Sequence, residues 1–171
     1  MHPSAGAMPK KAAGFYGDNT FTYMMWLKVT SVYIAQAAGF DVLFQDADLV
    51  WVMDPIPYLK SFKEDAIFMD DGARSPRFAP YFSNSGFYFL RSNKKTTYFQ
   101  ELMLMAYWEI EKSHSHQSAL IHHMIEAHSL FGIGVRILDE ELFPSGIMFH
   151  HSKKYIADLK AHVKIPYVFH M

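Results

Sequence analysis

Two carboxylates one residue apart, Asp46 and Asp48, follow an apolar run at residues 42–44 and precede another at residues 49–52. Burying a carboxylate within such a run costs free energy unless the group is paired or binds a metal. Two of them around the small Ala47 form a site for a hard divalent cation, which prefers oxygen ligands. A cation held there neutralises a diphosphate, so the pattern indicates an enzyme that acts on a nucleotide-linked substrate.

The composition limits the class of protein. The chain has 171 residues, 50% of them hydrophobic and 16% aromatic, which indicates one packed globular domain. A net charge of -1 provides no basic field for a nucleic acid. The absence of cysteine excludes disulfides and thiolate zinc sites. The sequence has no apolar run long enough to cross a bilayer, and residues 1–14 lack the apolar core of a signal peptide.

The elements that must position the two carboxylates follow from the sequence pattern. A helix is predicted from Thr20 to Ala38, ended by Gly39. Strands are expected at 41–46, 49–52, 66–69, 86–91, 134–138, 147–150 and 163–169, and helices at 95–111 and 115–128. Alternating strands and helices predict an α/β sandwich, in which ligands bind at the carboxyl ends of strands. Asp46 and Asp48 occupy such a position.

Lys28 falls within the apolar stripe of the predicted helix. A lysine there extends its amine to water, pairs with an acidic group, or meets a phosphate. The pattern leaves all three open.

Five motifs follow one another along the chain, at residues 39–59, 84–92, 116–120, 143–149 and 168–170. They resemble, in the same order, the motifs of the nucleotide-diphospho-sugar transferases of glycosyltransferase family 77. The resemblance covers residues 14–170. It implies a GT-A-like, Rossmann-type α/β/α sandwich with a mixed, mostly parallel sheet.

The resemblance also has implications for domain organisation. Family members carry a strand–helix–strand unit before the position of residue 20, which helps to bind the nucleotide, and an Asn-Trp pair beyond that of His170. We therefore expect a fragment of a larger transferase. Residues 1–18 would be a flexible lead-in, and residues 19–171 a partial domain with a truncated nucleotide-binding unit.

Roles for individual residues are implied in the same way. Asp46 and Asp48 would bind the donor and Mn²⁺, with Mg²⁺ as the alternative ion, and His170 would be a third metal ligand. The ion would act as a Lewis acid on the departing nucleotide.

The remaining site residues would act on the donor. Lys28, Asn84 and Gly86 would bind it, with Asn84 and Gly86 in a turn before a strand. Gln117 would lie beside the anomeric carbon. His116 stands where the family has Asp, and an imidazole cannot replace a fixed carboxylate. We expect this change to affect sugar choice or activity at the catalytic pair His116–Gln117.

The implied function is a retaining, metal-dependent glycosyltransferase that moves a sugar from a UDP-sugar to a glycan or glycoprotein hydroxyl. UDP-arabinose, UDP-xylose and UDP-galactose are the implied donors. The implied location is the Golgi lumen, as a type II membrane protein whose anchor lies outside this chain. Two alternatives stay open. One is a haloacid-dehalogenase-like phosphatase, which also carries Asp-x-Asp after a strand. The other is a non-catalytic remnant that binds nucleotide or glycan.

Overall fold

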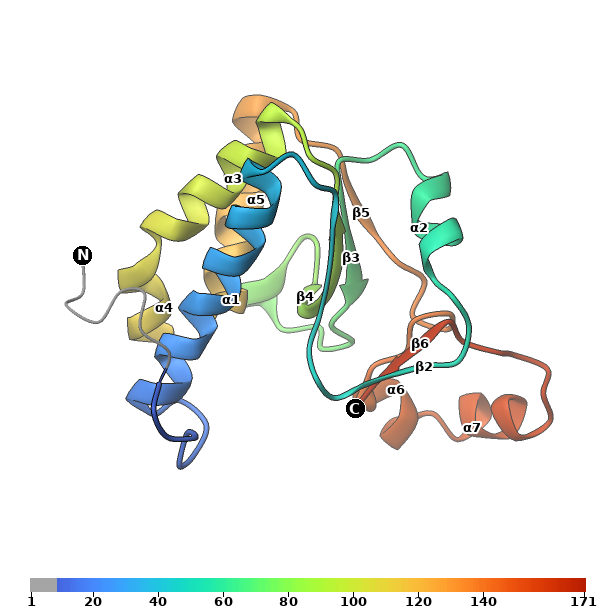
Figure 1. Cartoon of the computed structure of the whole chain (residues 1–171). Helices are drawn as coiled ribbons and strands as arrows, with labels where there is room; N and C mark the ends of the chain where they lie inside the picture. Colours follow the sequence, from blue (N-terminus) through green and yellow to red (C-terminus); the bar gives the residue numbers. More distant parts are fainter. Residues whose placement is uncertain (1–8) are drawn as a thin grey trace.

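The computed structural model describes residues 9–171. A four-stranded sheet has the order β1-β4-β3-β5, and β2 and β6 form a separate two-stranded sheet (Figure 1). The elements follow in the order α1 (Asn19–Ala37), β1 (Val42–Gln45), β2 (Leu49–Trp51), α2 (Ile56–Ser61), β3 (Ala66–Asp70), η1 (Pro76–Phe78), β4 (Ser83–Leu90), α3 (Lys94–Met105), α4 (Tyr107–Ser113), α5 (His116–Phe131), β5 (Val135–Ile137), α6 (Gly146–His151), α7 (Lys153–Lys160) and β6 (Val168–His170).

Both faces of the larger sheet are covered by a hydrophobic core. Successive residues of β3 and β4 point to opposite sides, so each strand contributes to both cores. On one side Phe68 and Tyr88 join a core built with α1, α3 and α5. On the other, Ile67 and Phe87 pack in a second core with Leu59 of α2. Figure 1 shows α1, α3 and α5 on one side of the sheet, and α2 with the β2–β6 pair on the other. The predicted α/β sandwich is confirmed.

Helix α1 confirms the helix expected near residues 20–38. Asp18 caps its first turn by accepting a hydrogen bond from the Phe21 amide at 2.7 Å. Val29 and Val32 are buried in the core against the sheet. Gly39 then takes a φ of +89°, a conformation that glycine adopts without strain and that ends the helix.

The directions of the strands differ in part from the expectation. The sheet is mixed, as predicted, and β3–β5 is a parallel pair. The pairs β1–β4 and β3–β4 are antiparallel, so parallel pairing does not dominate among the described strands. The link between β3 and β4 contains only the short η1 and no crossover helix of the kind that usually joins parallel strands.

Four other parts of the chain also differ from the expectation. Residues 147–150 belong to helix α6, because a short apolar run does not by itself distinguish strand from helix. The strand expected at 163–169 is confined to β6, since Pro166 offers no amide hydrogen to a ladder. The helix expected at 95–111 is two helices, α3 and α4, that meet at Ala106. Helix α7, which Ser152 caps, was not predicted.

The predicted lead-in lies only partly within the described residues. Residues 1–8 fall outside them. Residues 9–18 contain bends and turns, and the Gly14 amide donates to the Asp18 carboxylate at 2.6 Å. Across residues 9–171, none of the helices combines the length and apolar character that a bilayer crossing requires.

Candidate functional site

The loop between β1 and β2 carries both predicted carboxylates. The Asp46 amide donates to the Gly86 carbonyl at 2.7 Å, which keeps this residue against β4. The Asp48 carbonyl accepts from the Met171 amide at 3.2 Å, which keeps it against the end of β6. The two carboxylates therefore lie where the chain passes from the four-stranded sheet to the β2–β6 pair.

His170 joins these carboxylates from the last position of β6, opposite Leu49 of β2. Its Nε2 atom lies 3.3 Å from Asp48 Oδ1. One ligand atom from each of Asp46, Asp48 and His170 can be chosen so that all three lie within 4.8 Å of one another. Carboxylate oxygens and imidazole nitrogens are both common ligands of divalent metal ions. The donor set therefore fits a divalent metal ion.

Gly86 lies at the centre of this group, and its lack of a side chain creates the space. A Cβ atom there would lie 2.5 Å from His170 Cε1 and 2.9 Å from both Asn84 Oδ1 and Asp46 Oδ2. Atoms cannot approach so closely, so only glycine lets the three side chains converge. Asn84 and Gly86 lie within β4 and not in a turn before it, because the strand begins at Ser83.

Lys28 reaches the same group from α1. Its Nζ atom lies 2.5 Å from Asp46 Oδ1, and the side chain is 18% exposed. The same Nζ lies 5.3 Å from the centre of the Phe44 ring, over the apolar end of β1. Of the three possibilities for this lysine, the structure shows pairing with an acid.

A chain of amides extends from Gly86 to α5. Asn84 accepts a hydrogen bond from the Gly86 amide at 2.6 Å and donates to Asp71 Oδ1 at 3.3 Å. Gln117 Nε2 donates to the same Asp71 oxygen at 2.8 Å, while its Oε1 accepts from the Ser85 hydroxyl at 3.2 Å. Sequence reasoning missed Asp71, because Asp70, Asp71 and Gly72 form a common turn pattern. Only the tertiary structure brings it to Gln117.

His116 is buried and takes no part in this hydrogen-bond network. The side chain is 2% exposed, and neither ring nitrogen has a hydrogen-bond partner of normal geometry. Burial lowers the pKa of His116 to about 3, and the nearby Lys28 charge acts in the same direction, while the Ser85 backbone opposes them. The imidazole is therefore neutral near pH 7.

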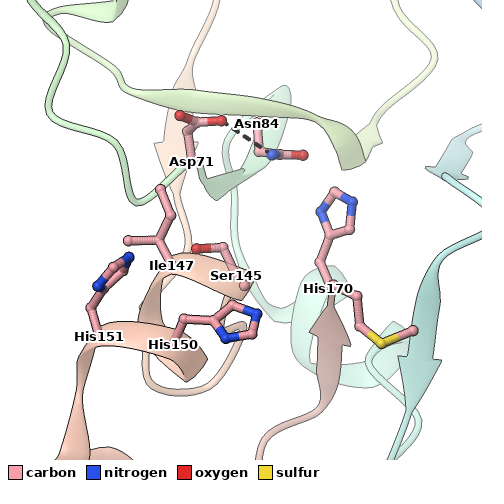
Figure 2. A pocket seen from close by; sticks show the side chains of 9 residues that line it. Asp71, Asn84, Ser145, Ile147, His150, His151 and His170 are labelled. Carbon is pink, nitrogen blue, oxygen red and sulfur yellow. Dashed lines mark hydrogen bonds between the residues drawn. The ribbon is translucent and has the colours of Figure 1, made fainter. Parts of the chain in front are cut away.

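A cavity of about 350 Å³ opens beside the cluster, within the size range of small-ligand sites. Figure 2 shows Asp71 and Asn84 on one side of it, with Ile147, His150 and His151 of α6 across from them. The His170 ring points toward Asn84 from a third side. Asp48 is more open to solvent, with its side chain 54% exposed. The cavity thus joins a candidate metal site to a wall of amide and carboxylate groups.

Comparison with known proteins agrees with this arrangement. The sequence profile of the nucleotide-diphospho-sugar transferase family matches residues 2–171. Beta-arabinofuranosyltransferase RAY1 of Arabidopsis thaliana is 28% identical over an alignment of 152 residues, and the match covers 77% of this chain and 27% of that protein. UDP-D-xylose:L-fucose alpha-1,3-D-xylosyltransferase MGP4 of the same plant is 52% identical over 33 residues, 19% of this chain and 9% of that protein. The chain matches about a quarter of the length of the first relative and about a tenth of the second.

Proposed function

This chain belongs to the nucleotide-diphospho-sugar transferase family, and we propose that it carries the donor site of a metal-dependent, retaining glycosyltransferase. The substrate would be a UDP-sugar, and the acceptor a hydroxyl group of a glycan or glycoprotein. The observation that carries the proposal is the convergence of Asp46, Asp48 and His170 beside a cavity that Asp71 and Asn84 also line. Family membership favours this function over the phosphatase that the Asp-x-Asp pattern left open.

In this proposal the metal site holds the diphosphate. Asp46, Asp48 and His170 would bind Mn²⁺, with Mg²⁺ as the alternative ion. Bound there, the ion would stabilise the negative charge that builds up on the departing nucleotide. Lys28 would keep Asp46 in place and add a positive charge near the phosphates.

The amide network would hold the sugar. Asn84 sits at the metal end of the cavity. Gly86 leaves room for Asp46, Asn84 and His170 to converge there. Gln117 would lie near the anomeric carbon, on the face opposite the leaving group, where a polar group would stabilise an oxocarbenium-like transition state. Its oxygen already accepts from Ser85. An amide oxygen is a weak nucleophile, so we favour transfer on one face without a covalent intermediate.

His116 would act as a buried, neutral side chain that precedes Gln117 in the sequence. Such a ring cannot bind a sugar hydroxyl as a carboxylate would. In the proposal, this substitution for the family Asp changes the position of Gln117, and through it the choice of sugar.

The donor sugar is left to experiment. The names of the two relatives specify an arabinofuranosyl and a D-xylosyl group. We propose pentose donors first, UDP-arabinose and UDP-xylose, with UDP-galactose as a hexose for comparison. From the resemblance, we also propose that the full-length protein resides in the Golgi lumen, anchored by a membrane helix outside this chain.

The test is release of UDP from each of the three donors with Mn²⁺, with and without L-fucose as an acceptor. Metal-dependent release, lost on chelation and in Asp48→Asn, supports the proposal. A product with inverted anomeric configuration would overturn the retaining mechanism. UDP binding with no release from any donor would favour the non-catalytic remnant.

A further inference from the structure

Asp71 is fixed at the junction of three elements. It follows β3 directly, and its amide donates to the Phe82 carbonyl at 2.7 Å, just before β4. The next residue, Gly72, has a φ of +77° and lies so close to α6 that a Cβ atom there would be 2.6 Å from Ser145 Oγ. The carboxylate of Asp71 therefore has a set position at the cavity wall.

One oxygen of this carboxylate orients two amides. Asp71 Oδ1 accepts from Asn84 Nδ2 at 3.3 Å and from Gln117 Nε2 at 2.8 Å. A carboxylate only accepts, so it turns the nitrogen of each amide toward itself. The amide oxygens then face the protein, toward Gly86 and Ser85. Each amide oxygen therefore already accepts a hydrogen bond from the protein.

The charge of Asp71 is not balanced by an ion pair among the described residues. Arg74 pairs with the adjacent Asp70, through contacts of 2.6 and 3.1 Å to its two oxygens, and with Glu140. Asp71 is also the acidic residue among those that line the cavity. An acceptor of this kind would repel a phosphate, but it binds neutral hydroxyl groups well.

We propose that Asp71 binds hydroxyl groups of the transferred sugar and, through Oδ1, positions Gln117 and Asn84. This rests on the proposed function, since it requires the metal cluster to hold the diphosphate at the other end of the cavity. Oδ1 serves the two amides, and Oδ2 accepts from the sugar. Ile147, across the cavity in Figure 2, supplies an apolar surface for the ring. Asp71 thus contributes to the choice of sugar and not to the affinity for nucleotide.

The test compares nucleotide with nucleotide-sugar on the full chain. Dissociation constants for UDP, UDP-xylose, UDP-arabinose and UDP-galactose are measured calorimetrically with Mn²⁺ for wild type and Asp71→Asn. Asp70→Asn is the matched control, because it removes the neighbouring carboxylate, which lies outside the cavity. We expect Asp71→Asn to change the UDP constant less than twofold and to weaken at least one UDP-sugar tenfold or more. Asp70→Asn should leave the ratio of the UDP dissociation constant to that of each UDP-sugar unchanged.

A second measurement, without any ligand, tests whether Asp71 positions the two amide side chains. In ¹⁵N spectra, the side-chain amide signals of Asn84 and Gln117 should shift in Asp71→Asn and stay in place in Asp70→Asn. If Asp71→Asn does not fold, Asp71→Ser takes its place. An unchanged ratio of UDP to UDP-sugar affinity, or unmoved amide signals, overturns the inference while the proposed function stands. Failure of the folded wild type to bind UDP with Mn²⁺ overturns both.

Discussion

Lys28 Nζ and Asp46 Oδ1 lie 2.5 Å apart, which places a fixed positive charge directly beside a candidate metal ligand. The contact joins α1 to the end of β1, and both side chains are largely shielded from water, at 18% and 30% exposure. A cation in this position has two opposing effects. It repels a metal ion bound to Asp46, and it attracts the phosphates that such an ion would hold.

Removing that charge should separate the two effects. In Lys28→Met we expect Mn²⁺ alone to bind roughly fivefold more tightly, the order expected for one screened unit charge. UDP at saturating Mn²⁺ should bind more weakly than to wild type. Calorimetric titrations of metal and of nucleotide measure the two constants. Lys60→Met, at an exposed position of α2, is the control and should change neither. Weaker Mn²⁺ binding in Lys28→Met would contradict this account of the pair.

The space at Gly86 should be essential to the site. In Gly86→Ala the new methyl group would displace His170, Asn84 or Asp46. We expect loss of at least tenfold in Mn²⁺ affinity. Gly134→Ala is a matched control, because its Cβ would have only ordinary contacts, of 3.4 Å and longer. Equal Mn²⁺ affinity in the two variants would show that the ligands do not converge as described.

His116 should make the protein sensitive to mild acid. Its pKa is lowered to about 3 in the folded chain, while an unfolded histidine titrates near 6.5. The unfolded state therefore binds the extra proton between these values, and stability falls as the pH drops below about 6.5. The slope approaches about 1.4 kcal/mol per pH unit. Urea unfolding at pH 7.5, 6 and 5 measures it.

The matched variant for this prediction is His116→Gln, which has no proton to gain in that range. For this variant we expect the free energy of unfolding to depend less steeply on pH between pH 6.5 and 5 than it does for wild type. A hydrogen bond from Arg136 is the main cause of the lowered pKa of Glu64. Protonation of this carboxylate therefore lowers the stability of the fold only at a lower pH. The same slope in wild type and His116→Gln would contradict the assignment.

Phe143 should be important for the strand that carries His170. It is fully buried, and its ring lies 5.5 Å from that of Tyr167, just before β6. Phe143→Ala should lower the free energy of unfolding by about 3–5 kcal/mol. Leu130→Ala, at a 66% exposed position of α5, should change it by less than about 0.5 kcal/mol. Denaturant titration of both variants measures these changes. A small loss of unfolding free energy in Phe143→Ala would contradict the packing described.

Much of the site was predictable because its signals are local. The apolar runs on either side of the Asp-x-Asp pair and the glycine that ends α1 determine structure over a few residues. They predicted β1, β2 and α1 close to their observed positions. The link between His170 and Asp48 depended on the family resemblance, because 122 positions separate the two residues in the sequence.

Other parts depend on contacts that no local pattern records. Asp71 and Gln117 are 46 residues apart, and their hydrogen bond exists only once β4 has brought Ser85 beside α5. Helix α6 was expected to be a strand because Ile147 and Phe149 are typical of strands. Both are 42% exposed, so burial does not determine the local conformation there. Tertiary contacts, such as Ser145 against Gly72, hold this segment.

Calorimetric titration of UDP into the folded chain, with and without Mn²⁺, for wild type and Asp48→Ala tests the proposed metal-dependent donor site most directly. Asp54→Ala, which alters an exposed carboxylate near α2, is the control. We expect UDP binding that requires both Mn²⁺ and Asp48 and that persists in the control. Absence of binding in the folded wild type, or binding that ignores the metal and Asp48, would contradict the proposed site.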